Sequence, residues 1–204
     1  MICEKCFLDL PRIVPPVCSK CGRPESSGGL CPGCWSTPPS IDGIRSVFRF
    51  EGIVRKAIHQ LKYYDLKTIS KDLAKILYDY ITFNKLEYEV IVPVPLHKKR
   101  LRHRGYNQSL LIARELGKLT NNDVLTDVLV RVKEGVSQAR TTGVQQRVKN
   151  VKDAFSCHGH SAMNRKVILI DDVCTSGATL ESCAEALKSA GAETVWGLTI
   201  AREI

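Results

Sequence analysis

Two adjacent acids, Asp171 and Asp172, stand between an apolar run and a run of small residues in the segment VILIDDVCTSGATL, residues 167–180. Ionised carboxylates only accept hydrogen bonds, so an adjacent pair suits a ligand that offers hydroxyl groups. The apolar residues before the pair are typical of a strand that is covered on both faces. Because ligands of open parallel sheets bind outside the carboxyl ends of the strands, we expect both acids to line a binding site.

The small residues after the acids are typical of an anion-binding turn. A helix that begins near Ala178 or Thr179 would present free backbone N–H groups and the positive end of its dipole to this turn. Glycine lets the backbone approach a ligand closely, and the hydroxyl groups add donors. The expected cradle for one phosphate group is Thr175, Ser176, Gly177, Ala178 and Thr179.

A ribose 5-phosphate fits both halves of this segment. The segment matches neither GxxxxGK[ST] nor GxGxxG, which argues against a triphosphate or a dinucleotide. The 5-phosphate would sit in the cradle, and the 2- and 3-hydroxyls would donate to the acids. The plainer alternative is a helix N-cap with acids at the helix start. It accounts for one acid and one hydroxyl, but not for two acids on an apolar strand followed by a run of small residues.

Cysteines are concentrated at the N-terminus, where six of the nine fall in the first 34 residues as three CxxC pairs. Two such pairs supply the four thiolates of a closed, tetrahedral zinc site, which holds a fold together rather than catalysing. The ligands we prefer are Cys18, Cys21, Cys31 and Cys34. Cys3 and Cys6 could replace one of these pairs or stay reduced and unused. A redox role is less well supported, because nothing near Cys3 resembles the strand end of a βαβ unit.

The composition of the whole chain is typical of a globular protein with a basic surface. The formal net charge is +9 and the isoelectric point is about 9.1, which favours phosphate-rich partners or simply gives a basic surface. No stretch reaches the ~18 apolar residues that a membrane span needs, and MICEKCFLDLP lacks the core of a signal peptide. We therefore expect a cytoplasmic protein without membrane insertion, whose cysteines stay reduced.

The order of elements predicts an α/β fold, with a parallel sheet flanked by helices and a small zinc-ribbon-like head. The turn-rich segment 35–43 separates a head of residues 1–40 from a domain of residues 41–204. Apolar patterns predict strands over 46–50, 89–95, 127–132, 166–171 and 194–202, and helices from Gly52 and over 73–81, 107–119 and 179–192. The last strand, helix and strand form a βαβ unit, which implies a parallel sheet.

A strongly basic segment, HKKRLRHRGY at residues 97–106, follows the strand predicted over 89–95. The guanidinium fork of arginine matches phosphate oxygens, so Arg100 and Arg104 are the best candidates to bind phosphate through their side chains. The segment could instead follow a nucleic-acid backbone, with a base stacked on Tyr106. A solvated basic stretch is the alternative without a ligand.

The segment 167–180 resembles the signature with which type I phosphoribosyltransferases bind phosphoribosyl pyrophosphate (PRPP). The resemblance implies that Asp171 and Asp172 contact the ribose hydroxyls and that residues 175–179 bind the 5-phosphate. Cys174 belongs to the same segment, at a position where that family more usually has a branched or aromatic residue. The implied fold is that of a type I phosphoribosyltransferase.

The order of segments along the chain narrows the resemblance to the ComF family of competence-associated, phosphoribosyltransferase-like proteins. The paired cysteines are followed by LKYYDLK, VPVPLHKKRLRHRGYNQS, SQARTTGVQQRVKNVKDAF and the PRPP signature. This resemblance implies a role in the uptake or processing of incoming single-stranded DNA, with competence-machinery proteins as partners. Two functions fit: phosphoribosyl transfer, with pyrophosphate leaving together with Mg²⁺, or non-catalytic handling of single-stranded DNA.

The same resemblance implies roles for segments outside the signature. In related phosphoribosyltransferases the loop after the strand at 89–95 binds pyrophosphate, so the backbone candidates are Val94, Pro95 and Leu96. Segment 137–150 lacks apolar periodicity in its first half and could close over bound PRPP, which would bring Arg147 and Lys149 to the phosphates. Lys62 ends a predicted helix and could reach the site or cap that helix.

Overall fold

The protein is described by a computed structural model that covers residues 9–132 and 154–204. Cys3 and Cys6 lie outside the described residues, as do segment 137–150 and its Arg147 and Lys149. The predictions for these residues therefore stay predictions.

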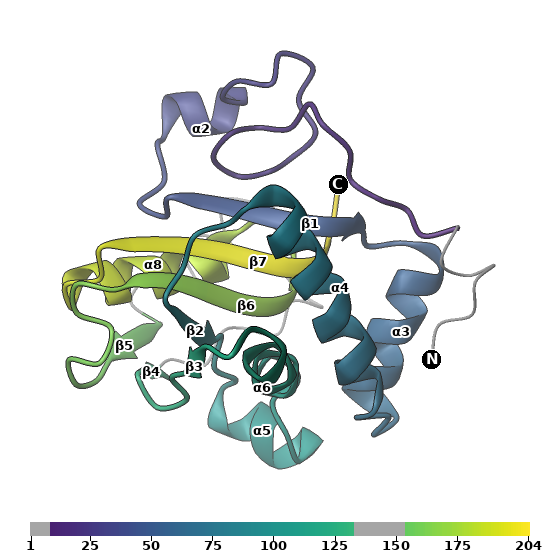
Figure 1. Cartoon of the computed structure of the whole chain (residues 1–204), viewed down its shortest axis with the longest axis vertical. Coiled ribbons are helices and arrows are strands. Elements are labelled where there is room, and N and C mark those ends of the chain that lie inside the picture. The colour runs from purple at the N-terminus through teal and green to yellow at the C-terminus, as the bar shows by residue number, and fades with distance from the viewer. Residues whose placement is uncertain (1–8, 133–153) are drawn as a thin grey trace.

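A single parallel sheet forms the centre of the molecule (Figure 1). Its five strands are ordered β1-β7-β6-β2-β3, and every neighbouring pair is parallel. Their bounds are β1 Gly43–Arg49, β2 Val90–Pro93, β3 Asp123–Val124, β6 Lys166–Cys174 and β7 Thr194–Arg202. The α/β class that the sequence predicts is confirmed.

Helices cover both faces of this sheet and bury two apolar cores. On one face lie α4 (Ile69–Asn84) and α6 (Gln108–Thr120), which pack on each other and on the strands. On the other face lies α8 (Ala178–Ser189), beside an antiparallel pair made by β4 (Leu129–Arg131) and β5 (Phe155–Cys157). The strand predicted over 127–132 therefore exists, but it pairs outside the main sheet.

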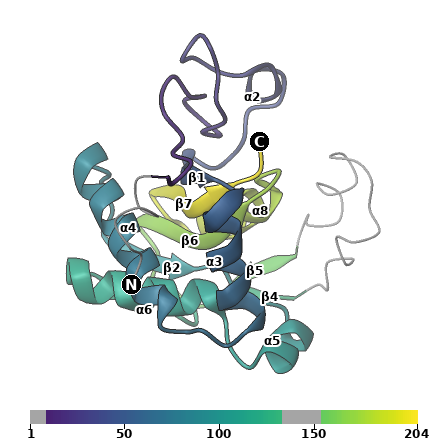
Figure 2. The ribbon, with the colours of Figure 1, turned by 90° about the vertical axis from the view of Figure 1, so that its right-hand side faces the viewer.

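The carboxyl ends of the strands face α3 (Gly52–Tyr63), which crosses in front of them in Figure 2. Two details at this edge differ from the expectation. Strand β6 does not stop at Asp171 but continues to Cys174, because its pairing with β7 extends to Arg202. The basic segment after β2 folds as helix α5 (Lys98–Arg104), which His97 caps by accepting a hydrogen bond from the N–H of Lys99.

The cysteine-rich head lies along the β1 edge of the sheet, with a short helix α2 (Pro32–Ser36) at its far end (Figure 1). The part of the head before Cys18 also contacts β1, since the N–H of Ile13 donates to the carbonyl of Val47 over 2.9 Å. The predicted boundary at residue 40 stays a prediction. In the described part of the chain, no helix has both the length and the apolar character that crossing a membrane requires.

Close packing between α6 and β3 gives a stability prediction. A Cβ atom at Gly117 would lie 2.5 Å from Cγ2 of Val124 and 3.1 Å from the carbonyl oxygen of Asn122. Overpacking costs about 1–3 kcal/mol and exceeds the ~1 kcal/mol that alanine gains over glycine in a helix. We expect Gly117→Ala to lower the melting temperature by about 2–4 °C in a thermal unfolding scan.

Gly33→Ala provides the matched control, because Gly33 is also helical and nothing lies within 4 Å of the added Cβ. Its melting temperature should not fall. A Gly117→Ala protein as stable as the parent would contradict the close approach of α6 to β3.

Candidate functional site

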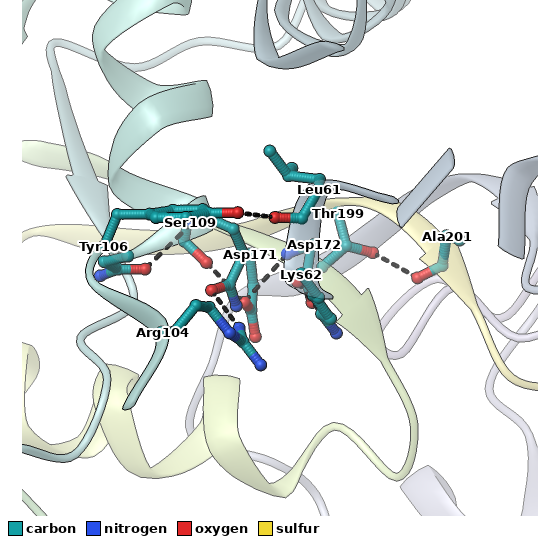
Figure 3. A network of polar contacts seen from close by, with 11 residues as sticks. Leu61, Lys62, Arg104, Tyr106, Ser109, Asp171, Asp172, Thr199 and Ala201 are labelled. Carbon is teal, nitrogen blue, oxygen red and sulfur yellow. Dashed lines mark hydrogen bonds and ion pairs between the residues drawn. The ribbon is translucent and has the colours of Figure 1, made fainter. Parts of the chain in front are cut away.

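The two aspartates lie inside β6 and take partners from two different helices (Figure 3). Oδ2 of Asp172 lies 2.9 Å from Nζ of Lys62, in the last turn of α3. Oδ1 of Asp171 accepts a hydrogen bond of 2.8 Å from the hydroxyl of Ser109, in the first turn of α6, and one of 2.9 Å from the N–H of Asp172. The pair therefore stands at the carboxyl edge of the sheet, where the sequence places it.

Burial strongly perturbs one of these carboxyl groups. Burial, followed by the negative charge of Asp172, raises the pKa of Asp171 from 3.8 to about 7. The hydrogen bond from Ser109 and the charge of Lys62 oppose this rise without cancelling it. At neutral pH, Asp171 can therefore exchange a proton, and a ligand that donates hydroxyl groups would favour its ionised form.

The segment between α5 and α6 positions the two partners of the aspartates. The hydroxyl of Tyr106 donates to the carbonyl of Leu61, the neighbour of Lys62. Asn107 caps α6 by accepting from the N–H of Ser109, and its Nδ2 donates to the carbonyl of Val94 over 2.9 Å. This short segment therefore ties the end of α3, the start of α6 and the end of β2 together.

These contacts correct the interpretation of Tyr106. Its side chain is only 9% exposed, and its ring lies 4.8 Å from Nζ of Lys67. A base cannot stack on a buried ring, so the prediction that Tyr106 is a stacking platform is wrong.

Sequence analysis also missed Ser109 as a residue of the candidate site. The available signal was its place in the first turn of a helix that begins at the same edge of the sheet as the acidic pair.

The turn after β6 contains the residues that the sequence predicts as an anion cradle. The residues Thr175, Ser176, Gly177, Ala178 and Thr179 are all half-buried, so each keeps some contact with solvent. Gly177 caps α8 with φ of 86°, a conformation that favours glycine. A Cβ on this glycine would also stand 3.2 Å from Cδ1 of Ile44. The backbone conformation therefore favours glycine where α8 begins, and a larger residue would also press on Ile44.

Cys174 differs from the rest of the predicted PRPP-binding segment because its side chain points into the protein. It is 3% exposed, and its sulfur accepts a hydrogen bond of 3.0 Å from Nη2 of Arg202. Burial raises the pKa of the Cys174 thiol to about 11, so the side chain is neutral at physiological pH. Its backbone carbonyl is also occupied, because it accepts a hydrogen bond of 2.9 Å from the N–H of Glu203.

The loop after β2 offers fewer backbone donors than its sequence suggests. The N–H of Val94 donates to the carbonyl of Ile170 over 3.0 Å, and Pro95 has no N–H. This leaves Leu96 as the backbone donor of the predicted trio. Among the side-chain candidates, Arg100 is exposed on α5.

Arg104 is held from two sides. Its Nη1 donates to Oε1 of Gln108 over 2.5 Å, and its guanidinium carbon lies 5.4 Å from the centre of the Tyr63 ring. The side chain is therefore positioned before any ligand binds.

The four preferred cysteines come together in the head, and their sulfur atoms lie within 4.8 Å of one another. The sulfurs of Cys21 and Cys31 are 3.7 Å apart. Zinc–sulfur bonds of ~2.3 Å in a tetrahedron require sulfurs about 3.8 Å apart, so the cluster fits zinc. Burial raises the pKa of the Cys21 and Cys34 thiols, and a bound cation would be needed to hold both as thiolates.

With this geometry established, comparison with known proteins gives the class of the chain. Residues 108–202 match the family model described as the phosphoribosyl transferase domain. This range begins in the first turn of α6 and ends with β7, so it contains Ser109, both aspartates and the cradle. The fold is that of a phosphoribosyltransferase-type domain.

Three relatives match nearly the whole chain. Competence protein F of Haemophilus influenzae is 31% identical, over 97% of this chain and 89% of its own length. Competence protein ComFC of Bacillus subtilis is 27% identical, with coverage of 98% and 84%. DNA utilization protein YhgH of Escherichia coli K12 is 27% identical, with coverage of 95% and 87%. The chain belongs to the ComF family.

Solved structures resemble the chain more distantly. The glutamine PRPP amidotransferase of B. subtilis has a TM-score of 0.41 and 19% identity, and the match covers 65% of this chain and 25% of that one. The purine phosphoribosyltransferase of Pyrococcus horikoshii has a TM-score of 0.41 and 16% identity, and the match covers 65% and 81%.

The raised pKa of Asp171 predicts a pH-dependent effect on stability. The folded state binds the proton more tightly than the unfolded state, so this carboxyl group costs stability progressively as the pH rises from 3.8 to about 7. Asn in its place stays neutral and keeps an oxygen for Ser109. We expect Asp171→Asn to raise the melting temperature at pH 8 by about 3 °C, and by less at pH 5.

Asp79→Asn is the control, because Asp79 is exposed on α4 and pairs with Lys75. It should change the melting temperature little at either pH. An equal gain for Asp171→Asn at pH 5 and pH 8 would show that Asp171 does not titrate as described.

Proposed function

We propose that the carboxyl edge of the sheet binds PRPP together with Mg²⁺. One observation carries this proposal: the acidic pair of β6 leads directly into a glycine-capped turn at the N-terminus of α8. A ligand at this edge meets hydrogen-bond acceptors from β6 and, next to them, backbone donors and the positive end of a helix dipole. A ribose that carries a 5-phosphate has the matching groups in the matching order.

The roles of the residues follow from their contacts. The ribose hydroxyls would donate to Asp171 and Asp172, in place of or beside the contact that Lys62 makes with Asp172. The 5-phosphate would bind residues 175–179. The pyrophosphate would lie toward the basic helix α5, where Leu96 offers its N–H and where Arg100 and Arg104 supply charge.

We further propose that the site supports phosphoribosyl transfer. The bond between C1 of the ribose and the pyrophosphate oxygen breaks, and pyrophosphate takes the bonding electrons. An acceptor nucleophile forms the new bond to C1 and loses its proton. Mg²⁺, when bound, neutralises charge on the leaving pyrophosphate. The residues of the chain position the ribose and stabilise the charges that develop.

The printed names of three relatives support a biological setting for the proposed activity. Two of them are named competence proteins and a third a DNA utilization protein. We propose that the chain takes part in the uptake or processing of incoming DNA and contacts competence-machinery proteins. Its reduced cysteine cluster is suited to the cytoplasm, and zinc is the metal that its four sulfurs fit.

Binding of PRPP is the direct test of this proposal. Millimolar PRPP with Mg²⁺ should raise the melting temperature of the protein by several degrees, because a ligand at 100 times its Kd adds about 2.7 kcal/mol. The double substitution Asp171→Asn with Asp172→Asn should abolish the shift, while Asp79→Asn should preserve it. If the parent protein gives no shift at all, the site does not bind PRPP.

A second function, binding of single-stranded DNA, is favoured by the surface around α5. Four of its seven residues are exposed Lys or Arg, and none of the seven is acidic. Two aromatic side chains at the end of α3 are open to solvent, with Tyr63 63% and Tyr64 70% exposed. Arg104 lies over the Tyr63 ring and thus connects the basic helix to the aromatic pair. Cations with exposed rings suit a nucleic-acid strand.

Charge reversal on α5 tests this second function. The double substitution Lys99→Glu with Arg102→Glu should weaken the binding of a fluorescent single-stranded oligonucleotide at least tenfold and reduce the slope of affinity against salt. The PRPP-induced shift should stay as in the parent protein. Reversal of Lys75 and Lys118 on α4 and α6 changes the net charge equally and should have little effect. Unchanged DNA binding by the α5 variant would remove this surface from consideration.

A further inference from the structure

The cysteine knuckle CSKC at residues 18–21 is bound directly to the sheet. Three consecutive carbonyl oxygens of the knuckle accept hydrogen bonds from the phosphoribosyltransferase-type domain: Ser19 from Nη2 of Arg45 at 3.1 Å, Lys20 from the N–H of Ile44 at 2.7 Å, and Cys21 from Nη2 of Arg202 at 2.6 Å. The predicted metal site is therefore fixed to β1 and β7 through the residues that carry its ligands.

Arg202 joins this knuckle to the cradle. The same Nη2 atom that donates to the carbonyl of Cys21 also donates to the sulfur of Cys174, over 3.0 Å. Cys174 is the last residue of β6 and directly precedes the cradle at 175–179. One guanidinium nitrogen therefore contacts both the backbone of a predicted metal ligand and the strand end that carries the phosphate-binding turn.

The charge of Arg202 requires a partner that the described carboxylates do not supply. The side chain is 1% exposed, and no carboxylate of the described residues forms an ion pair with it. Its Nε also has no hydrogen-bond partner among these residues. Burial of a lone cation is costly. Four cysteine thiolates around one Zn²⁺ form a doubly negative complex, which would supply the missing counter-charge beside Cys21.

A second set of contacts, made by packing around Ile44, also joins the knuckle to the start of α8. Gly22 lies against the backbone of Ile44, because a Cβ there would stand only 2.3 Å from the carbonyl oxygen of Ile44. The side chain of Ile44 in turn reaches the start of α8, where its Cδ1 would be 3.2 Å from a Cβ at Gly177. A shift of the knuckle therefore reaches the cradle through packing as well as through the guanidinium.

We infer that the cysteine cluster, when it holds zinc, positions the phosphate-binding turn, and that Arg202 is the positioning residue that connects the two. Loss of the metal removes the counter-charge of Arg202, releases Cys174 and loosens the turn at 175–179. The head then acts on the ligand site without contacting the ligand. The inference rests on the proposed binding of zinc and PRPP and adds a coupling between them.

Alkylation of cysteines in the full-length protein tests the coupling without PRPP. Zinc content is measured first, and iodoacetamide labelling is then followed by mass spectrometry before and after chelation. Labelling of Cys174 should be at least tenfold faster in the chelated protein. Cys183, which is buried in α8, is the internal control and should stay protected. The inference is overturned if the folded protein holds no zinc, if Cys174 stays protected after chelation, or if Cys183 loses protection equally.

Two substitutions distinguish a specific effect of Arg202 on Cys174 from a general loosening of the head. Arg202→Met should expose Cys174 to labelling while zinc is still bound, and Arg202→Lys should restore part of the protection. Arg45→Met is the matched control, because Arg45 also donates to the knuckle but does not contact Cys174. It should leave Cys174 protected. Equal labelling in the Arg45 and Arg202 variants would assign the effect to loosening of the whole head. If Arg202→Met does not fold, the chelation experiment on the parent protein still decides.

Reciprocal binding measurements then connect the coupling to PRPP. Chelation should weaken PRPP binding about tenfold, and saturating PRPP should slow the loss of zinc to a colorimetric chelator by a similar factor. If PRPP does not bind the zinc-loaded protein, the proposed function fails, while labelling of Cys174 still reports on the coupling. If PRPP binds equally with and without zinc, the proposed function stands and the coupling is wrong.

Discussion

Two neighbouring carboxylates in one buried strand repel each other, and the ligand edge of this protein depends on how that repulsion is relieved. Asp172 pairs with Lys62 from α3, and Asp171 is held by Ser109 from α6. Each acid therefore takes its direct partner from a different helix. The acidic pair is therefore held only when α3 and α6 are both docked, and the part of the chain before β6 is as necessary to the site as the signature itself.

A short stretch of chain supplies this docking. Gly105 ends α5 in a left-handed conformation, with φ of 81°, and so turns the chain toward α6. Tyr106 then fixes the carbonyl next to Lys62, and Asn107 caps α6 while it holds the end of β2. These residues act on a ligand only through others. Tyr106 closely follows a basic helix, so the sequence suggests a contact with nucleic acid. The structure shows instead that its hydroxyl binds the backbone of α3.

The sequence predicted the features that local patterns determine. Apolar runs and turn residues located the strands and helices, the four cysteines preferred among three CxxC pairs do cluster, and the acidic pair lies at the carboxyl edge of the sheet as expected. It did not predict contacts between distant residues, such as that between Ser109 and Asp171, which are 62 positions apart. It also missed helix α5, because a helix in which no residue is buried shows no apolar periodicity. The buried guanidinium of Arg202 was invisible for a related reason, since an arginine at the end of an apolar strand is usually exposed.

The boundary between head and domain shows how composition and energetics can differ. Composition divides the chain near residue 40, yet Glu181 of α8 accepts hydrogen bonds from the backbone N–H groups of Ser40 and Ile41. Asp42 in turn binds Lys188 and the N–H of Val195. A head this small cannot bury a core of its own, so it depends on such contacts with the rest of the chain. The same contacts hold α8, whose first turn forms part of the proposed phosphate cradle, and so the stability of the head and the shape of the proposed ligand site depend on shared hydrogen bonds.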